Sequence, residues 1–210
     1  GVPDNFRNWF VVQFDNPLEN IMVYDSPSKG LGEALEFEGE HALAVVGFRT
    51  QRGEKVNVRT ASSFISLEQA WRNLEEIGDR SFDEVRDEAK DKWNKVLSRI
   101  QVAGGSEDQY RTFYSCLYRS TLFPRKFYEM DAEGKPYHYS PYNGEVCDGY
   151  LYTDTGFWDT FRALFPLLNL VYPSVNMEIQ MGLANIAREN EFLPEWASPG
   201  HRGCMVGNNS

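Results

Sequence analysis

The chain carries the run Thr155-Gly156-Phe157-Trp158-Asp159-Thr160-Phe161-Arg162-Ala163-Leu164. A second run follows further along, Phe192-Leu193-Pro194-Glu195-Trp196-Ala197-Ser198-Pro199-Gly200-His201-Arg202. Both runs place a tryptophan directly beside a carboxylate. An indole covers the apolar face of a pyranose ring, and a carboxylate binds hydroxyls or moves protons. The two runs together are therefore typical of a sugar-binding cleft.

Glu195 is the chief candidate for chemistry. Pro194 and Trp196 flank it and give it stiff, apolar surroundings. An apolar setting disfavours the charged carboxylate, raises its pKa and so suits a general acid. Taken alone, a glutamate after a proline is usually a solvated surface residue. The assignment of Glu195 therefore depends on the motif around it.

Trp158 and Asp159 stand where a helix is expected to begin. The carboxylate of Asp159 could simply stabilise the helix start, or pair with Arg162 at i,i+3. The functional alternative is that Trp158 and Asp159 face a bound sugar, and both interpretations stay open. His201 lies in a Gly/Pro-rich loop, where contact with a substrate hydroxyl is the weaker alternative to plain solvation.

The first third of the chain has the pattern of β-strands. Short apolar runs end at turn signals and predict strands at 9–14, 21–24, 42–48 and 55–60. The run 42–48 is apolar on both faces, so we expect it to be buried. The run 55–60 alternates, as a half-buried antiparallel strand does. Short strands at this spacing indicate part of a β-sandwich.

Helical patterns take over at Ser66. Three serines, each followed three residues later by Gln or Glu, predict capping boxes at Ser66, Ser81 and Ser106. Beyond them we expect a long ordered loop over 127–153, because that stretch has many tyrosines but no steady period. Two further helices are predicted, over 157–170 and from Pro173 to about Asn190.

Composition excludes some classes of function. With 41% hydrophobic and 14% aromatic residues, the 210-residue chain can bury a core without disulfides. A formal net charge of -10 argues against nucleic acid as a partner, because phosphates need a basic surface. No apolar run is long enough for a transmembrane helix, so we expect no membrane span.

Cysteines and histidines give no metal pattern. Cys116, Cys147 and Cys204 match no zinc spacing, and buried free thiols are expected. His41 and His138 have no partners at metal-ligand spacing and receive no role.

The two tryptophan runs, with the following Met205-Val206-Gly207-Asn208, closely resemble the bacterial α-mannosidases of glycoside hydrolase family 92. The resemblance runs from about Tyr110 to Ser210. It implies a multidomain α and β protein, with an N-terminal antiparallel β-sandwich followed by an (α/α)₆ barrel. Residues 1–65 would then be the C-terminal part of the sandwich, 66–105 the linker helices, and 106–210 the N-terminal part of the catalytic barrel.

The resemblance also implies an activity. Members look like calcium-dependent exo-α-mannosidases that invert anomeric configuration, here most plausibly on α-1,2-linked mannose. Glu195 takes the place of the acid that protonates the leaving oxygen, and relatives that cleave mannose-phosphate linkages carry glutamine there. Trp158, Asp159, Trp196 and His201 would contact the mannose-containing glycan. The catalytic base and the calcium ligands are expected beyond Ser210, so the metal site is unknown.

Two other functions are also compatible with the sequence. One is a non-catalytic glycan-binding segment, which would share the aromatic residues but not need Glu195. The other is another (α/α)₆ glycosidase, such as a glucosidase. Residues 1–210 alone, without the remainder of the parent chain, are expected to be inactive. Helix faces such as Val175-Ile179-Leu183-Ile186 would then lack partners, so we expect either an exposed apolar surface near the C-terminus or a second chain that covers it. By resemblance, the parent protein is expected in the periplasm or outside the cell.

Overall fold

The computed structural model describes residues 1–24, 32–33, 36–39, 41–191 and 193–203. It divides into two units, one made of Gly1–Phe10 with Ala61–Ser210 and the other of Val11–Thr60. All strand pairs that it defines are antiparallel. Within the described residues, no helix is both long and apolar enough to cross a bilayer.

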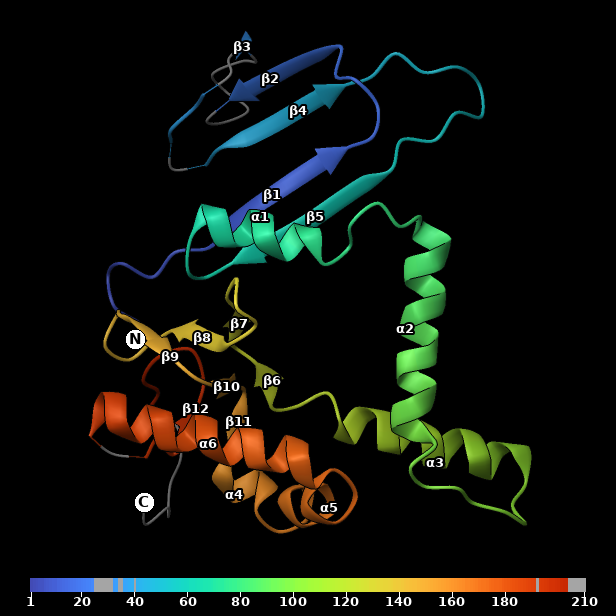
Figure 1. Cartoon of the computed structure of the whole chain (residues 1–210), viewed down its shortest axis with the longest axis vertical. Coiled ribbons are helices and arrows are strands. Elements are labelled where there is room, and N and C mark those ends of the chain that lie inside the picture. Colours follow the sequence, from blue (N-terminus) through green and yellow to red (C-terminus); the bar gives the residue numbers. More distant parts are fainter. Residues whose placement is uncertain (25–31, 34–35, 40, 192, 204–210) are drawn as a thin grey trace. The chain divides into compact units, whose positions relative to one another are not determined.

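The unit Val11–Thr60 is built from short strands. A three-stranded sheet has the order β3-β2-β4, and β1 pairs with β5 (Figure 1). The bounds of these strands are β1 Trp9–Phe14, β2 Asn20–Tyr24, β3 Gly32–Glu33, β4 Leu43–Gly47 and β5 Val58–Ser63. The strands predicted at 9–14 and 21–24 are therefore confirmed.

Two expectations for this unit were wrong. β5 begins at Val58, because the predicted start at 55 falls in a segment whose Asn57 binds the Asp15 carboxylate instead of extending the strand. β4 is not buried on both faces, since Leu43 is 46% and Val45 38% exposed. An apolar run shows that a strand can be buried, but burial needs a partner layer over each face.

Helices follow in the larger unit, and their starts agree with the sequence. Ser81 begins α2 (Phe82–Leu97) and Ser106 begins α3 (Glu107–Ser120), each with a complete capping box. Ser66 caps α1 (Leu67–Glu75) by accepting from the backbone of Gln69. There the box is only half made, because Oε1 of Gln69 accepts from Arg72 and from the Tyr137 hydroxyl, and the Ser66 N–H donates to the Ser63 hydroxyl instead.

The apolar residues of α2 are only partly covered, although Val96 and Leu97 pack against the main core. No residue of this helix is fully buried, and Phe82 is 74% exposed. The cysteines also differ from expectation, because Cys116 is exposed and Cys147 half-buried, although both are free thiols. Cys204 lies outside the described residues.

The stretch 127–153, expected as an ordered loop, contains several very short strands. β8 (Pro136–Tyr139) pairs with β7 (Glu129–Met130) on one side and β9 (Val146–Asp148) on the other. β10 (Tyr152–Thr153) pairs with β6 (Arg125–Lys126). Strands of two to four residues leave no alternation long enough to detect in the sequence.

The single helix predicted over 157–170 is two helices. α4 spans Phe157–Thr160 and α5 spans Leu164–Val171. Pro166 explains the break, because a proline ring clashes with the carbonyl four residues earlier and so prevents Arg162 from continuing the helix.

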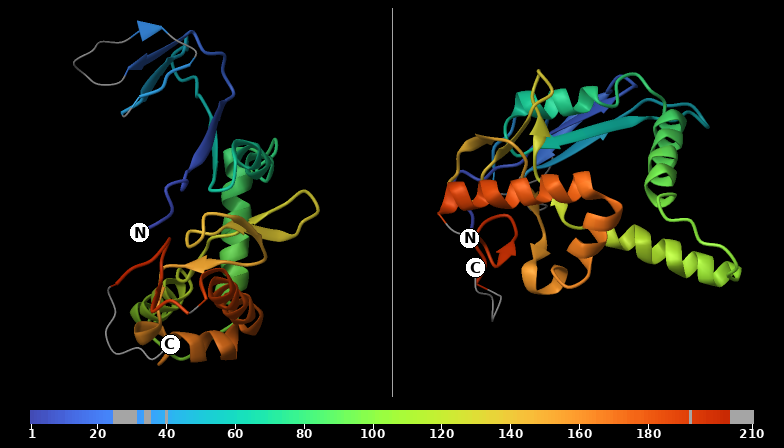
Figure 2. Two further views of the ribbon diagram at one scale, coloured as in Figure 1. Left: turned by 90° about the vertical axis from the view of Figure 1, so that its left-hand side faces the viewer. Right: turned by 60° about the horizontal axis from the view of Figure 1, so that its bottom comes forward.

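The helix predicted from Pro173 is confirmed as α6 (Pro173–Asn190), which ends at Glu191 with φ of 66°. It packs against α5, as both views show (Figure 2). One face of α6 enters the main core through Ile179, Leu183 and Ile186. The remaining buried members of this core are Leu117, Phe127, Leu151, Tyr152, Leu168, Tyr172 and Ala197.

Another part of the α5–α6 surface is apolar and exposed. Leu170 is 83%, Met177 58%, Met181 47% and Val175 40% exposed. The uncovered face was expected on Val175-Ile179-Leu183-Ile186, and this was wrong for Ile179, Leu183 and Ile186, which are buried in the main core. The division into a sandwich, linker helices and an (α/α)₆ barrel, with its boundaries at 65 and 105, stays a prediction.

Candidate active site

The two tryptophan motifs meet through a short antiparallel pair. β11 (Thr155–Gly156) pairs with β12 (Trp196–Ala197), and Gly156 lies opposite Trp196. Thr155 is 2% exposed and its partner Ala197 is fully buried. The first motif is therefore attached to the second from within the core of the larger unit.

Gly156 is the contact point of this pair. A Cβ on Gly156 would stand 2.7 Å from Cε3 of Trp196 and 2.8 Å from Oδ2 of Asp159. The indole and the carboxylate thus both lie against the bare backbone of the glycine. The structure thus brings Asp159 and Trp196 together across Gly156, and their common role in sugar binding stays a prediction.

Glu195 directly precedes this strand. Its carbonyl accepts the backbone N–H of Phe157 at 3.4 Å, and its side chain is half-buried between buried Pro194 and half-buried Trp196. Within the described residues its carboxylate makes no hydrogen bond or ion pair. The backbone of Glu195 is thus fixed to the first motif, while its carboxylate stays available to a ligand.

Arg162 contacts the ring of Trp158 and does not pair with Asp159 among the described residues. The guanidinium of Arg162 lies 4.5 Å from the centroid of the Trp158 ring and 4.9 Å from that of Phe161. Arg162 therefore stacks on aromatic rings, and in the described part of the chain it forms no ion pair with Asp159. Both Trp158 and Asp159 are exposed. The shared cavity predicted for Trp158, Asp159, Trp196 and Glu195 stays a prediction.

His201 is held in a loop that packs on the 140–144 turn. Its ring meets the Tyr142 ring edge-on at 5.3 Å, and its backbone N–H donates to the Gly1 carbonyl at 2.9 Å. The Tyr142 hydroxyl donates to the carbonyl of Ser198 at 3.1 Å. Burial, together with the negative charge of Glu189, raises the pKa of Tyr142, so this hydroxyl remains a donor.

The sequence did not indicate an ion pair between Arg125 and Asp154. Nε of Arg125 donates to Oδ2 of Asp154 at 2.5 Å, and Asp154 has a left-handed backbone with φ of 61°. Such a backbone in a non-glycine residue is costly unless its surroundings hold it. The ion pair holds the corner that directs the chain into β11. The one available signal was Asp154 immediately before the motif, whereas Arg125 is too far away in sequence to be found.

A buried histidine was also missed. Nε2 of His138 lies 2.9 Å from Oε1 of Glu189, and Nδ1 lies 2.9 Å from the Gly149 carbonyl. Cys147 stands beside them, and its pKa is raised by burial and by the Glu189 carboxylate. No spacing rule links these three residues, because they come from two strands and a distant helix.

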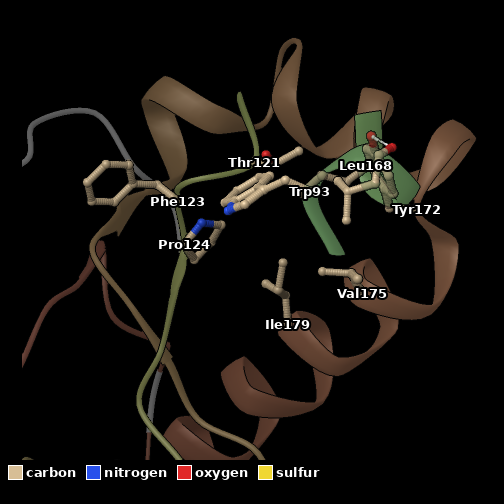
Figure 3. A pocket seen from close by; sticks show the side chains of 9 residues that line it. Trp93, Thr121, Phe123, Pro124, Leu168, Tyr172, Val175 and Ile179 are labelled. Atoms are coloured by element: carbon tan, nitrogen blue, oxygen red, sulfur yellow. Dashed lines mark hydrogen bonds between the residues drawn. The ribbon is translucent and has the colours of Figure 1, made fainter. Parts of the chain in front are cut away.

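The cavity drawn in Figure 3 lies elsewhere in the larger unit. It has a volume of ≈ 180 Å³ and is lined by side chains from α2, α5 and α6, among them Trp93, Leu168 and Ile179. Its lining is almost wholly apolar, whereas a sugar needs several polar groups placed around its hydroxyls. This cavity therefore does not suit a glycan, and none of the motif residues lines it.

Calcium does not fit the described residues. It takes six to eight oxygen ligands. The one group of potential metal ligands in the described part of the chain is His138, Cys147 and Glu189, which offers nitrogen, sulfur and oxygen. The positions described therefore give no calcium site.

The Trp196 indole and the Asp159 carboxylate lie against Gly156 of one strand pair, beside a glutamate whose carboxylate has no partner in the described part of the chain, and this arrangement is typical of carbohydrate-active proteins. The chain belongs to one family of that class: residues 69–210 match the glycosyl hydrolase family 92 catalytic domain. The family expected from the tryptophan motifs is thereby confirmed.

Solved structures agree with this membership. An inverting mannosidase of the family from Bacteroides thetaiotaomicron VPI-5482 is 46% identical, with a TM-score of 0.89 over 99% of this chain and 28% of that one. An α-mannosidase of the family from Bacteroides thetaiotaomicron is 26% identical, with a TM-score of 0.82 over 96% of this chain and 28% of that one. The mixed α and β fold with antiparallel sheets is thus shared with family members.

A curated relative from Arthroderma benhamiae, described as an uncharacterized secreted glycosidase, is 37% identical over 78 residues. That match covers 35% of this chain and 10% of the relative. The chain thus spans 28% of the two solved structures and a tenth of the curated relative.

Proposed function

We propose that the protein containing this chain is a calcium-dependent, inverting exo-α-mannosidase that removes terminal α-1,2-linked mannose from glycans. One observation carries the proposal: the β11–β12 pair places Glu195 and Trp196 directly against the motif that holds Asp159. The related structures are of mannosidases, one of them inverting, and this supports the choice of sugar and stereochemistry.

Glu195 is the proposed general acid, which donates its proton to the oxygen of the leaving sugar. Its carboxylate has no partner among the described residues and is half-buried beside an indole, so it can approach a glycosidic oxygen. Trp196 and Trp158 offer ring faces to the sugar. Asp159 is proposed to bind sugar hydroxyls, and His201 is proposed to contact a further hydroxyl of the substrate.

The remainder of the parent chain would complete the site. An inverting hydrolase needs a base roughly 6.5–9.5 Å from the acid, with a water between them. We propose that this base and the calcium ligands come from that remainder, together with the rest of the (α/α)₆ barrel. Residues 1–210 alone should then have no measurable turnover. Turnover with calcium present would instead make Asp148, Asp154 or Asp159 the base.

A periplasmic or extracellular location is proposed with this function. The curated relative is described as secreted, which supports it.

The decisive experiment is Glu195→Gln in the full-length protein. Glutamine keeps the size of the side chain but cannot donate the proton, so hydrolysis of an α-1,2-mannobioside should fall by about 10²–10⁴-fold. An aryl mannoside with a good leaving group needs little protonation, so its hydrolysis should fall far less. The matched control is Glu191→Gln, the same change at an exposed residue just past α6, which should leave both rates unchanged.

The outcomes separate the alternatives. Equal losses on both substrates would show that Glu195 binds or positions the sugar and is not the acid. Undiminished hydrolysis of the mannobioside would favour a glycan-binding role for this segment. A panel of α-mannosides and α-glucosides, assayed with and without a chelator, tests the sugar and the metal. Full activity in chelator would contradict the calcium dependence.

A further inference from the structure

Three side chains from separate elements gather away from the tryptophan motifs. In the β8–β9 pair, His138 lies directly opposite Cys147, so both side chains are on one face of the sheet. The last turn of α6 adds Glu189. One donor atom from each residue lies within 4.8 Å of the other two.

The histidine is oriented as a metal ligand is. A carbonyl can only accept, so Nδ1 of His138 carries the hydrogen that is bonded to Gly149 at 2.9 Å. This leaves Nε2 to face the cluster. Histidine ligands of metals characteristically donate their other ring N–H to a carbonyl or carboxylate, which fixes the tautomer and the ring plane. His138 is fully buried, so its orientation is fixed before any ion arrives.

The cluster lacks a polar partner. Oε1 of Glu189 is bonded to His138, but Oε2 is buried without any hydrogen bond among the described residues, and the Glu189 side chain is only 9% exposed. Nδ2 of Asn190, the next residue, is a second buried atom that has no partner within the described part. Buried polar atoms are nearly always satisfied by protein, water or an ion. The buried Oε2 of Glu189, unpartnered among the residues described, therefore indicates that something polar belongs at the cluster.

We propose that His138, Cys147 and Glu189 bind a divalent cation of the zinc class. Imidazole nitrogen, thiolate sulfur and carboxylate oxygen are all zinc ligands. With bonds of about 2.0–2.3 Å, tetrahedral donor atoms stand roughly 3.3–3.8 Å apart. The present separations therefore need only small side-chain movements. The fourth position would be open to a water.

The charges of the ligands suit a divalent ion. Bonds to Nε2, Sγ and the carboxylate would bring together a neutral imidazole, a thiolate and a carboxylate, whose two negative charges balance a double positive charge. The proton of the Cys147 thiol would be released to solvent.

This site is separate from the calcium proposed for catalysis. Calcium prefers oxygen ligands, whereas two of the three donors here are nitrogen and sulfur. The role of the proposed ion would be structural. It would connect the β8–β9 pair to Glu189 in the last turn of α6, six residues before Glu195. The inference rests on these side chains alone and stands whether or not the parent enzyme cleaves mannosides.

The test uses the full-length protein, stripped with a chelator and then titrated with Co²⁺ or Zn²⁺ alone. Co²⁺ bound to a thiolate gives a charge-transfer band in the near ultraviolet. Cys147→Ser should abolish that band and weaken Zn²⁺ binding by about 100-fold or more, since even outer-shell changes cost 10–100-fold. Cys116→Ser, the same change at the exposed cysteine, should leave both unaltered. Glu189→Gln should weaken Zn²⁺ binding while keeping the thiolate band.

Three results would overturn the proposal. The first is a wild-type protein that gives no thiolate band with Co²⁺. The second is a band in Cys147→Ser as strong as in the wild type. The third is a Cys147 that is found in a disulfide when thiols are alkylated in the denatured, unreduced protein. Thermal unfolding of each variant in chelator controls for a folding defect, because a metal-free comparison should show no difference between the two serine variants.

Discussion

The larger unit and the unit Val11–Thr60 are each stabilised internally by a different kind of interaction. In the larger unit, a core of ten buried residues from α3, α5, α6 and the short strands surrounds Leu151, Ile179 and Ile186, each 1% exposed. In the unit Val11–Thr60, apolar strand residues such as Leu43 are largely exposed, and polar pairs such as Asp15–Asn57 connect neighbouring segments. Similar apolar runs thus give a core in one unit and exposed strands in the other. Stability and the candidate site should therefore depend mainly on the larger unit.

The largest expected difference comes from the same deletion made in each unit. Leu183→Ala removes a side chain that is 4% exposed, and it should lower the free energy of unfolding by about 2–5 kcal/mol. Leu43→Ala removes one that is 46% exposed, and it should cost about 1 kcal/mol or less. Urea unfolding of the full-length variants measures both changes. Equal losses would show that Leu43 is buried in the complete protein and would remove the contrast between the units.

Glycines sharpen the comparison at the candidate site. Gly156→Ala would press a methyl group into the Trp196 ring and the Asp159 carboxylate, and should cost about 1–3 kcal/mol and reduce mannosidase activity. Gly47→Ala would meet only the end of the exposed Asn20 side chain, which can turn into solvent. It should be nearly neutral for both stability and activity. If Gly156→Ala keeps full activity, the Gly156–Trp196 contact does not position the site.

The smallest expected effect is on the pH dependence of stability, where Tyr152 in the larger unit and Asp15 in the unit Val11–Thr60 should act in opposite directions. Burial, with a 2.8 Å hydrogen bond to Glu178, raises the pKa of Tyr152. The folded state holds this proton more tightly than the unfolded chain, so the stabilisation is present below about pH 10 and is lost as pH rises. Hydrogen bonds from Asn57 lower the pKa of Asp15, so its stabilisation is present above about pH 4 and is lost as pH falls.

Unfolding followed across pH tests this contrast. Tyr152→Phe should flatten the alkaline limb of stability, and Asp15→Asn should flatten part of the acid limb. The Asp15 effect should be the smaller, because that carboxylate is exposed. A Tyr152→Phe variant with an unchanged alkaline limb would show that this hydroxyl is not protected in solution.

The same contrast explains how much the sequence could predict. Local signals were sufficient for β1, for the capping boxes of Ser81 and Ser106, and for α6 from its proline to Asn190. These features depend on residues within a few positions of one another. The burial of β4 could not be predicted, because it depends on what covers the strand and not on the strand's own residues.

The site divides in the same way. Trp158, Asp159, Glu195 and Trp196 stand out because aromatic and acidic residues are adjacent in the chain. The ion pair Arg125–Asp154 and the pair His138–Glu189 join residues 29 and 51 positions apart, and no local pattern indicates such partners. Pro166 is a local signal that does predict a break in the helix expected over 157–170.

The β11–β12 pair also has a kinetic consequence. It joins residues about forty positions apart through only two residue pairs, with α4, α5 and α6 in the intervening loop. Closing a loop of that length costs entropy before the contact repays it, whereas helices form from local contacts. We therefore expect the helices to appear early in folding and the Gly156–Trp196 contact to form late. A chain caught between these stages would have its native helical content while Glu195 still lacked its place beside Asp159.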